Sequence, residues 1–268
     1  MAQLKYKLTS DILFKMVFVE RPDLLKRLVA KLLAIDETGI TAFAIKNTEI
    51  PPELIGEKYC HLDIHMDVDG QAVDLEVQVE DENDYPERSL YYWARDYSTA
   101  LKVRGHYSTL PRVVVISIVA FPLFDAAETH SEFELLEVNR HTRLTDRLSL
   151  HYFELPKLAD ELDEDDLQQL WLKLFYAKTE EELARLESLG VPEMTEAIGV
   201  YRYVTAKPEY QEYERLREEA RYNENAALLH AQQEAIKQTD VKWQNVVADK
   251  DAEIASLRAQ LNQQNNRR

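Results

Sequence analysis

One short stretch of the chain alternates acidic or histidine side chains with apolar ones, over residues 60–80, which read CHLDIHMDVDGQAVDLEVQVE. Such alternation is typical of half-buried strands, since successive side chains of a strand point to opposite faces. Within it lies Asp69-Gly70, a dipeptide typical of a two-residue type I′ turn, because glycine adopts positive φ without strain. The sequence therefore predicts a hairpin of two strands, 61–68 and 72–79, with one apolar and one polar face.

The two-residue turn determines which side chains of the polar face oppose each other. It brings three pairs together: His61 with Gln78, Asp63 with Glu76, and His65 with Asp74. Two opposed carboxylates lie about 5 Å apart, and like charges at that distance destabilise a sheet. A divalent cation such as Mg²⁺ would remove the repulsion, and it could also activate a bound water beside a phosphate. The alternative is an amphipathic hairpin whose polar face meets solvent.

Apolar periodicity predicts the elements that must position this hairpin. Helices are expected over residues 11–18 (capped by Thr9 and Ser10), 24–33, 86–104, 167–189 and 194–204, and further strands over 42–50, 113–119 and 148–155. The order helix, three strands, helix, strand predicts an α/β domain with a mixed sheet flanked by helices. We assign this domain to residues 1–205.

The composition changes after Pro208. Residues 209–268 contain no Gly or Pro and few large apolar side chains, which predicts one long helix. Some of its apolar residues recur in alternating steps of three and four, as a short, weak heptad seam: Trp243, Val247, Ile254, Leu257 and Leu261, with Lys250 at the missing position. The seam favours a coiled-coil homodimer through this helix. The alternative is a solitary, partly frayed helix.

The overall composition excludes several classes of protein. With 268 residues, 45% of them apolar, the chain can bury a core, and no apolar run approaches the ~18 residues of a membrane span. The lone cysteine, Cys60, excludes a disulfide scaffold, and on a strand it would point away from His61 and His65, which excludes a zinc cluster. The first residues, MAQLKYKLTSDILFK, carry charges where a secretory signal needs an apolar stretch, so we expect a cytoplasmic protein.

The formal net charge of −17 argues by itself against non-specific binding to nucleic acid. The acidic residues are concentrated in positions 51–100 and 151–200, each with 13 acidic side chains against three or four basic ones. The run from Asp160 to Asp166 in the second block is interpreted as the solvated start of a helix, since acidic residues favour a helix N-terminus. The first block contains the hairpin.

Five segments together resemble the Rpn-type recombination-promoting nucleases, also called PD-(D/E)XK nuclease family transposases: LTSDILFKMVF, LDIHMDVDG, DLEVQ, ERSLYYWARDYS and GHYSTLPRVVVISIV. The resemblance covers residues 5–160 in order and spacing. It implies a restriction-endonuclease-like core and a metal-dependent DNA endonuclease activity linked to recombination or mobile elements. The implied cofactor is Mg²⁺ or another divalent cation such as Mn²⁺ or Ca²⁺, and the implied partner is DNA.

The same resemblance assigns roles to residues of the hairpin. Asp63 stands at the first Asp of the family motif and Glu76 at its second acid, so both are expected to bind metal, with the Val77 carbonyl as a further ligand. Gln78 stands where the motif usually has a lysine. It can orient a water or the scissile phosphate by hydrogen bonds, but it cannot act as a base near neutral pH.

Basic residues outside the hairpin are candidates for contacts with DNA phosphates. Lys15 follows Asp11 by one helical turn, so this pair either forms a surface ion pair or lines the cleft, where Lys15 could replace the missing motif lysine. Arg88, Arg95 and Lys102 recur every seven residues and form either a phosphate-binding stripe or an exposed basic stripe. Arg88 also matches the family pattern and is favoured over the other two.

Two functions remain open at this point. The first is a Mg²⁺-dependent DNA endonuclease in which Asp63, Glu76, Gln78 and Asp11 are the catalytic candidates. The second is a catalytically weak or inactive nuclease fold that serves as a DNA-binding or interaction subunit. The missing motif lysine and the net charge motivate this second reading, and metal-dependent cleavage would separate the two.

Overall fold

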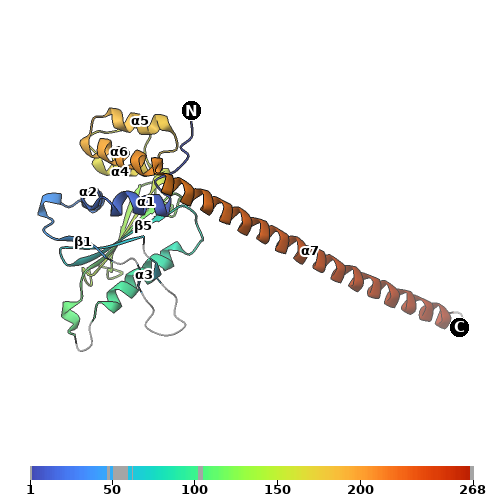
Figure 1. Ribbon diagram of the computed structural model, residues 1–268. Coiled ribbons are helices and arrows are strands. Elements are labelled where there is room, and N and C mark those ends of the chain that lie inside the picture. Colours follow the sequence, from blue (N-terminus) through green and yellow to red (C-terminus); the bar gives the residue numbers. More distant parts are fainter. Residues whose placement is uncertain (1, 47–48, 51–59, 62, 102–104, 266–268) are drawn as a thin grey trace. The chain divides into compact units, whose positions relative to one another are not determined.

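The computed structural model (Figure 1) describes residues 2–46, 49–50, 60–61, 63–101 and 105–265. The chain divides into two compact units, residues 1–207 and 208–268. In the part of the chain so described, no helix is both long enough and apolar enough to cross a membrane.

A six-stranded mixed sheet forms the centre of the first unit, with the strand order β1-β4-β5-β6-β8-β7. Its strands are β1 (Phe43–Ile45), β4 (Ile64–Val68), β5 (Gln71–Gln78), β6 (Val113–Val119), β7 (His130–Phe133) and β8 (Leu148–Glu154). The pairs β5–β6 and β6–β8 are parallel, and the other pairs are antiparallel. A separate two-stranded sheet pairs β2 (Glu49–Ile50) with β3 (Cys60–His61).

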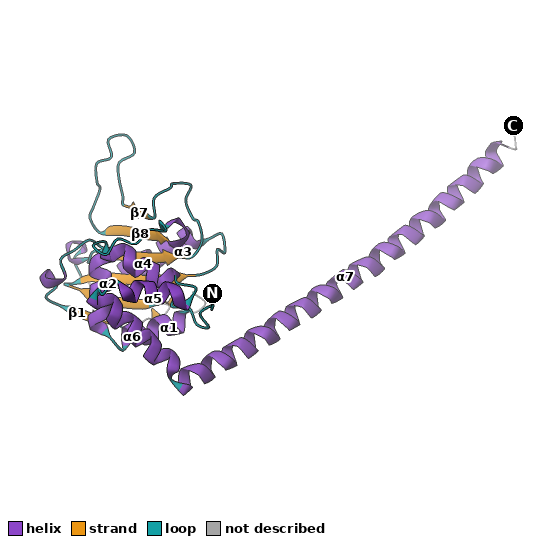
Figure 2. Ribbon diagram, turned by 90° about the horizontal axis from the view of Figure 1, so that it is seen from above, coloured by secondary structure: helices purple, strands orange, loops and turns teal. Residues whose placement is uncertain are grey.

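Helices cover both faces of the large sheet (Figures 1 and 2). Those of the first unit are α1 (Asp11–Val19), α2 (Pro22–Leu32), α3 (Tyr85–Thr99), α4 (Leu167–Tyr176), α5 (Glu180–Ser188) and α6 (Pro192–Ala206), with short 3₁₀ turns at Glu37–Gly39, Tyr107–Thr109 and Leu155–Lys157. α1 and α2 lie on one face with α4, α5 and α6 beyond them, and α3 lies on the opposite face. The predicted mixed sheet with flanking helices is confirmed.

Aromatic side chains fix α1 in this arrangement. Phe18 of α1 stacks on Phe175 of α4 with the ring centroids 5.9 Å apart, and Phe14 and Trp171 pack against the same pair. All four side chains are buried. Because large aromatic residues contribute much of the buried apolar area of a core, this contact holds the helix that carries Lys15.

Polar side chains attach α3 to the other face. Tyr85 donates a hydrogen bond from its hydroxyl to Ser117 Oγ on β6 (2.9 Å), and the hydroxyl oxygens of Ser89 and Tyr152 lie 2.5 Å apart. All four side chains are buried, and buried polar groups are costly unless they are hydrogen-bonded. These bonds therefore favour one position of α3, the helix that carries Arg88.

The hairpin has the predicted turn and register. Asp69 and Gly70 both have positive φ, 51° and 79°, as a type I′ turn requires. The Asp69 carboxylate accepts hydrogen bonds from the backbone N–H groups of Thr41 and Ala42, which joins the turn to the start of β1. The predicted pairing of His65 with Asp74 is confirmed.

The predicted strand over 61–68 is wrong in one respect: it is not continuous. The chain bends at Asp63, so that Ile64 is the first residue of β4 and His61 pairs with Glu49 of β2 instead of Gln78. The bend arises where the Asp63 N–H bonds a side chain rather than a backbone carbonyl. The strand expected over 42–50 likewise comprises the separate strands β1 and β2.

Other boundaries differ less. α3 ends at Thr99, before the expected 104, and residues 102–104 lie outside the described part of the chain. β7 was not predicted, because its four residues alternate too briefly to stand out from a loop. The acidic run does precede a helix: Asp166 caps α4 by accepting a hydrogen bond from the Gln169 N–H.

Gly70 provides a test of the turn. We expect Gly70→Ala to lower the free energy of unfolding by about 1 kcal/mol or more, because an L-residue with a side chain is strained at positive φ. Gly39→Ala is the matched control: there too nothing lies within 4 Å of an added Cβ, but Gly39 has no positive φ. Urea denaturation measures both, and equal stabilities would contradict the conformational role of Gly70.

Candidate active site

Asp63 and Glu76 are held together by two reciprocal hydrogen bonds. The backbone N–H of Asp63 donates to Glu76 Oε1 (3.0 Å), and the backbone N–H of Val77 donates to Asp63 Oδ2 (2.8 Å). Each carboxylate thereby accepts a bond from the main chain beside the other. The structure thus brings together the two acids that the hairpin register placed opposite each other, which we call the acid pair.

The acid pair lies inside the protein, in contrast to a solvated hairpin face. Glu76 is 2% exposed, and the neighbouring polar residues His65 and Asp74 are buried as well, so the alternative of a solvated polar face is wrong. Burial, and then the charge of Asp63, raise the pKa of the Glu76 carboxyl well above its usual value. No cationic side chain in the described part of the chain forms an ion pair with Glu76. A bound cation would therefore find an uncompensated acid there.

Lys15 reaches the acid pair from α1. Its ammonium nitrogen lies 3.7 Å from Asp63 Oδ1, and the side chain is partly exposed. The lysine therefore lies beside the acid pair, and its place in a cleft stays a prediction. The side chain of Asp11, the other helix candidate, lies outside what the structure describes.

Gln78 and Arg88 form a second contact at the end of β5. Arg88 Nη2 donates to Gln78 Oε1 (2.6 Å) and Nη1 donates to the exposed Glu82 (3.0 Å). The guanidinium also lies over the ring of Tyr85, 5.0 Å from its centroid. This geometry aims the Arg88 side chain at the same end of β5 as the acid pair.

The predicted basic stripe is only partly present. Arg88 has one-fifth of its side chain exposed and Arg95 is buried, so the alternative of an exposed basic stripe on α3 is wrong for both residues. Lys102 lies outside the described residues. Arg88 alone of the three has a described position beside the predicted site residues.

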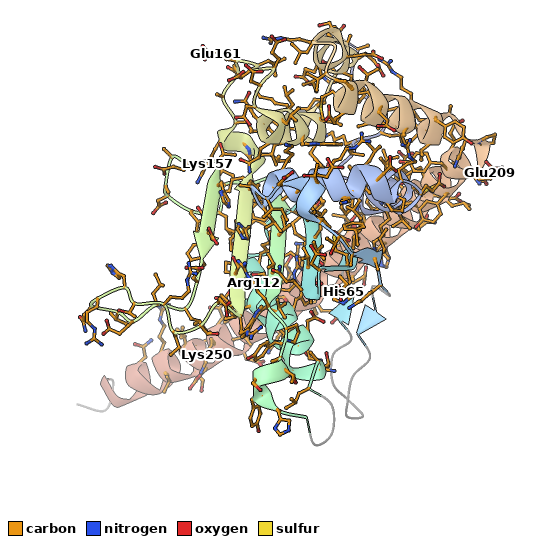
Figure 3. The ribbon with its side chains drawn as sticks, turned by 90° about the vertical axis from the view of Figure 1, so that its left-hand side faces the viewer. His65, Arg112, Lys157, Glu161, Glu209 and Lys250 are labelled. Atoms are coloured by element: carbon orange, nitrogen blue, oxygen red, sulfur yellow. The ribbon has the colours of Figure 1, made fainter. Side chains whose placement is uncertain are left out.

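Next to the acid pair on β5 lies a second group, the His65–Asp74–Asp96 cluster (His65 is labelled in Figure 3). His65 Nδ1 is 2.5 Å from Asp74 Oδ1, and His65 Nε2 is 3.7 Å from Asp96 Oδ1 on α3. One potential ligand atom from each residue lies within 4.8 Å of the others. A histidine nitrogen with two carboxylates is a set of groups that could hold a metal ion.

Burial controls the protonation of this cluster. It raises the pKa of Asp74 to about 6, although the hydrogen bond from His65 acts in the opposite direction. Burial also raises the pKa of Asp96, and the two aspartates outweigh burial in raising the pKa of His65. One carboxylate oxygen of each aspartate has no hydrogen-bond partner in the described part of the chain. The cluster thus has further capacity to bind a proton or a cation.

Asp96 was missed from the sequence. It falls eight residues after Arg88, about 80° further around α3 and thus within one broad helix face, which is the signal that could have found it. Asp74 follows the alternation of the hairpin, two residues before Glu76, and its pairing with His65 was predicted. The side chains of Cys60 and His61 lie outside the described part, so the expectation that they form no zinc cluster with His65 stays a prediction.

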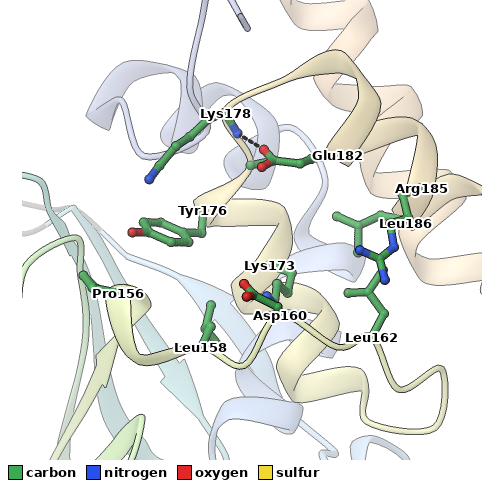
Figure 4. A pocket seen from close by; sticks show the side chains of 11 residues that line it. Pro156, Leu158, Asp160, Leu162, Lys173, Tyr176, Lys178, Glu182, Arg185 and Leu186 are labelled. Carbon is green, nitrogen blue, oxygen red and sulfur yellow. Dashed lines mark hydrogen bonds between the residues drawn. The ribbon is translucent and has the colours of Figure 1, made fainter. Parts of the chain in front are cut away.

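A separate pocket of about 470 Å³ lies among the helices (Figure 4). It is lined by side chains that include Lys173, Tyr176 and Arg185 from α4 and α5. No residue of β5 or α3 lines it. The acid pair therefore does not line this pocket.

The acid pair, of which Glu76 is buried, lies at the end of a central strand in a mixed sheet with helices on both faces, an arrangement that fits a nuclease-like α/β fold. A family model described as PD-(D/E)XK nuclease family transposase matches residues 8–231, which is most of the chain. The chain belongs to this family, and the resemblance noted in the sequence is confirmed. Comparison with curated proteins and with solved structures found no match.

The buried carboxyl of Glu76 gives a test in the absence of metal. With a chelator present at neutral pH, we expect Glu76→Gln to raise the free energy of unfolding by more than the ~0.5 kcal/mol typical of surface changes. The substitution removes a poorly compensated buried acid, and it keeps an oxygen that accepts the hydrogen bond from the Asp63 N–H. Glu82→Gln, at an exposed acid nearby, is the control.

The pH dependence has a defined sign. Between the usual Glu pKa of 4.5 and the raised pKa of Glu76, the folded protein holds a proton that the unfolded chain has lost. The protonated Glu76 side chain therefore contributes its full stability to the fold below pH 4.5. This contribution is lost as the pH rises through the pKa that Glu76 has in the folded protein. Thermal melts from pH 4 to pH 8 should show a widening advantage of Glu76→Gln, and a constant difference would argue against this assignment.

Proposed function

We propose that this protein is a metal-dependent DNA endonuclease that hydrolyses phosphodiester bonds. The observation that carries the proposal is the acid pair: two carboxylates, one of them buried, that backbone N–H groups hold facing each other, with the pKa of the buried one raised by burial and by the charge of the other. Family membership supports the reaction class, since PD-(D/E)XK nucleases are hydrolases. The name of the family also supports a link to recombination or mobile elements.

The donor atoms around the acid pair fit a hard divalent cation. Asp63 and Glu76 would hold it with carboxylate oxygens, and the Val77 carbonyl would be a further ligand. The N–H and C=O of one strand residue point to the same edge, and the Val77 N–H reaches Asp63, so its C=O faces that edge too. An all-oxygen donor set suits Mg²⁺, and Mn²⁺ or Ca²⁺ would also be accepted. When bound, the cation would supply the positive charge that activates water and stabilises the phosphate.

Gln78 would orient the attacking water or the scissile phosphate. Arg88 already donates to the amide oxygen of Gln78, which leaves the amide nitrogen of Gln78 as the group available to donate. Arg88 would also bind a DNA phosphate, in exchange for its contact with the exposed Glu82. Arginine suits this role because its planar donors match phosphate oxygens.

Lys15 would replace the missing motif lysine. Its nitrogen lies 3.7 Å from Asp63 Oδ1 and could contact a phosphate oxygen or the attacking water at the acid pair. This position favours the catalytic proposal over an inactive nuclease fold, because the basic group that the motif lacks at Gln78 would then come from α1. Asp11 stays a catalytic candidate from the sequence alone.

The acidity of the chain is compatible with DNA as substrate. Three of the acidic residues in the block 51–100 are Asp74, Glu76 and Asp96, which are buried. Buried acids count toward the formal charge but contribute to a site rather than to a repulsive surface. Lys15 and Arg88 provide positive charge beside that site.

The decisive variant is Asp63→Asn. It should abolish plasmid nicking with Mg²⁺ or Mn²⁺, because it weakens binding of the cation that activates water. The wild-type melting temperature should rise with metal concentration and that of the variant should not, because a ligand that binds only the folded state stabilises it. Without metal, the variant should be no less stable than the wild type, since one of two facing charges is gone.

Glu80→Gln is the matched control for this experiment, because Glu80 is exposed and lies just beyond β5. It should nick DNA and respond to metal as the wild type does. Full activity of Asp63→Asn would exclude the acid pair as the site, and a wild-type protein that never cleaves DNA would favour the non-catalytic alternative.

Arg88 can be tested through the salt dependence of DNA binding. Arg88→Ala should weaken binding to a similar extent for all sequences and reduce the slope of log K against log salt concentration by about one phosphate contact. Arg202→Ala removes an arginine of α6 that pairs with Glu187, and its slope should equal that of the wild type. Fluorescence anisotropy with Ca²⁺ at several salt concentrations measures both, and an unchanged slope for Arg88→Ala would remove it from the interface.

A further inference from the structure

The second unit consists of one helix with an unusual surface. α7 (Pro208–Asn265) has 58 residues, and at 1.5 Å per residue it extends for about 87 Å. Large apolar side chains along it are solvent-exposed, among them Leu229, Trp243 and Val247, each with more than half of its surface accessible. A long helix with such side chains gains stability when they are buried against a partner.

Many of the apolar side chains of α7 follow a heptad seam that begins well before Trp243. Steps of four and three run without interruption from Tyr222 to Leu261. Three seam positions are polar: Gln233, Asp240 and Lys250. Polar residues at seam positions specify the register and orientation of a coiled coil, so they indicate which pairing the seam permits.

A parallel pair of α7 helices in register would be unfavourable. It would bring Asp240 against Asp240 of the second copy and Lys250 against Lys250 of the second copy. Both like-charged pairs would lie in the seam, where partial burial strengthens repulsion. Lys250 forms an ion pair with the exposed Glu253 of its own helix, and an exposed pair of this kind is too weak to relieve that repulsion.

An antiparallel pair centred on residue 245 removes this conflict. Seam residues equally distant from the centre then face each other, so Asp240 meets Lys250 of the second copy. The same register matches apolar with apolar side chains in two further layers: Trp243 with Val247, and Ile236 with Ile254. Beside the seam it places Lys237 next to Asp251 of the second copy. In this orientation, charged residues of one helix therefore face residues of opposite charge on the second copy.

We propose that α7 binds α7 of a second copy of this chain as an antiparallel coiled coil in which Asp240 pairs with Lys250. The proposal does not depend on nuclease activity. It has a geometric consequence, because each helix begins 37 residues before the centre at residue 245. The two Pro208 ends would therefore be about 110 Å apart along the coil, whereas a parallel pair would bring them side by side.

Charge exchange in the full-length protein tests the pairing. Asp240→Lys alone and Lys250→Asp alone should each weaken the dimer, raising its dissociation constant about tenfold, because each creates two like-charged contacts. The double exchange should restore the wild-type dissociation constant, measured by sedimentation. A parallel pair predicts no such rescue. Circular dichroism checks that each variant stays helical.

Spin labels test the orientation directly. With Cys60→Ser as background, a label at Glu224→Cys should lie about 60 Å from its copy in an antiparallel dimer and about 20 Å in a parallel one. A label at Asn245→Cys, at the centre, should give about 20 Å and serves as the matched control. A short Glu224 distance, a failed charge rescue, or a monomeric wild-type chain at the concentrations used would each overturn the proposal.

Discussion

The contact between Asp63 and Glu76 is the interaction on which the rest of the site depends. Two carboxylates on the covered face of a sheet are unfavourable by themselves, and the chain holds each of them there with a hydrogen bond from a backbone N–H group. Hydrogen bonds to a carboxylate lower the cost of its burial but do not remove its charge. The arrangement is therefore organised for a positive ligand before any ligand binds.

The surrounding fold maintains this arrangement from two sides. α1 is fixed by its aromatic contacts with α4 and presents Lys15, while α3 is fixed by Tyr85 and presents Arg88. α1 is far from the hairpin in the sequence, α3 follows soon after β5, and the two helices lie on opposite faces of the sheet. The site is therefore complete only when the sheet and both helical layers have assembled. The His65–Asp74–Asp96 cluster shares β5 with the acid pair, because Asp74 lies two residues before Glu76 on that strand.

Much of this site could be predicted because a hairpin register is a local property. Asp69-Gly70 specifies the turn, the turn specifies the register, and the register brings Asp63 to Glu76. Burial of the polar face could not be predicted in the same way, since it depends on α3 packing across the sheet. Asp96 was missed for this reason, and the bend at Asp63 was missed because side-chain bonds to the backbone interrupt a strand without changing its alternating pattern.

The bend at Asp63 also implies a conflict between the regularity of the sheet and the usefulness of the site. In a continuous β4, a backbone carbonyl would receive the Val77 N–H, and the Asp63 carboxylate would lose the bond that aims it. A substitution that strengthened the strand at this point would thus make β4 continuous, and it would also move the Asp63 carboxylate away from its present position. Selection for stability alone would favour the straight strand, so the irregular one is the feature that a functional constraint must preserve.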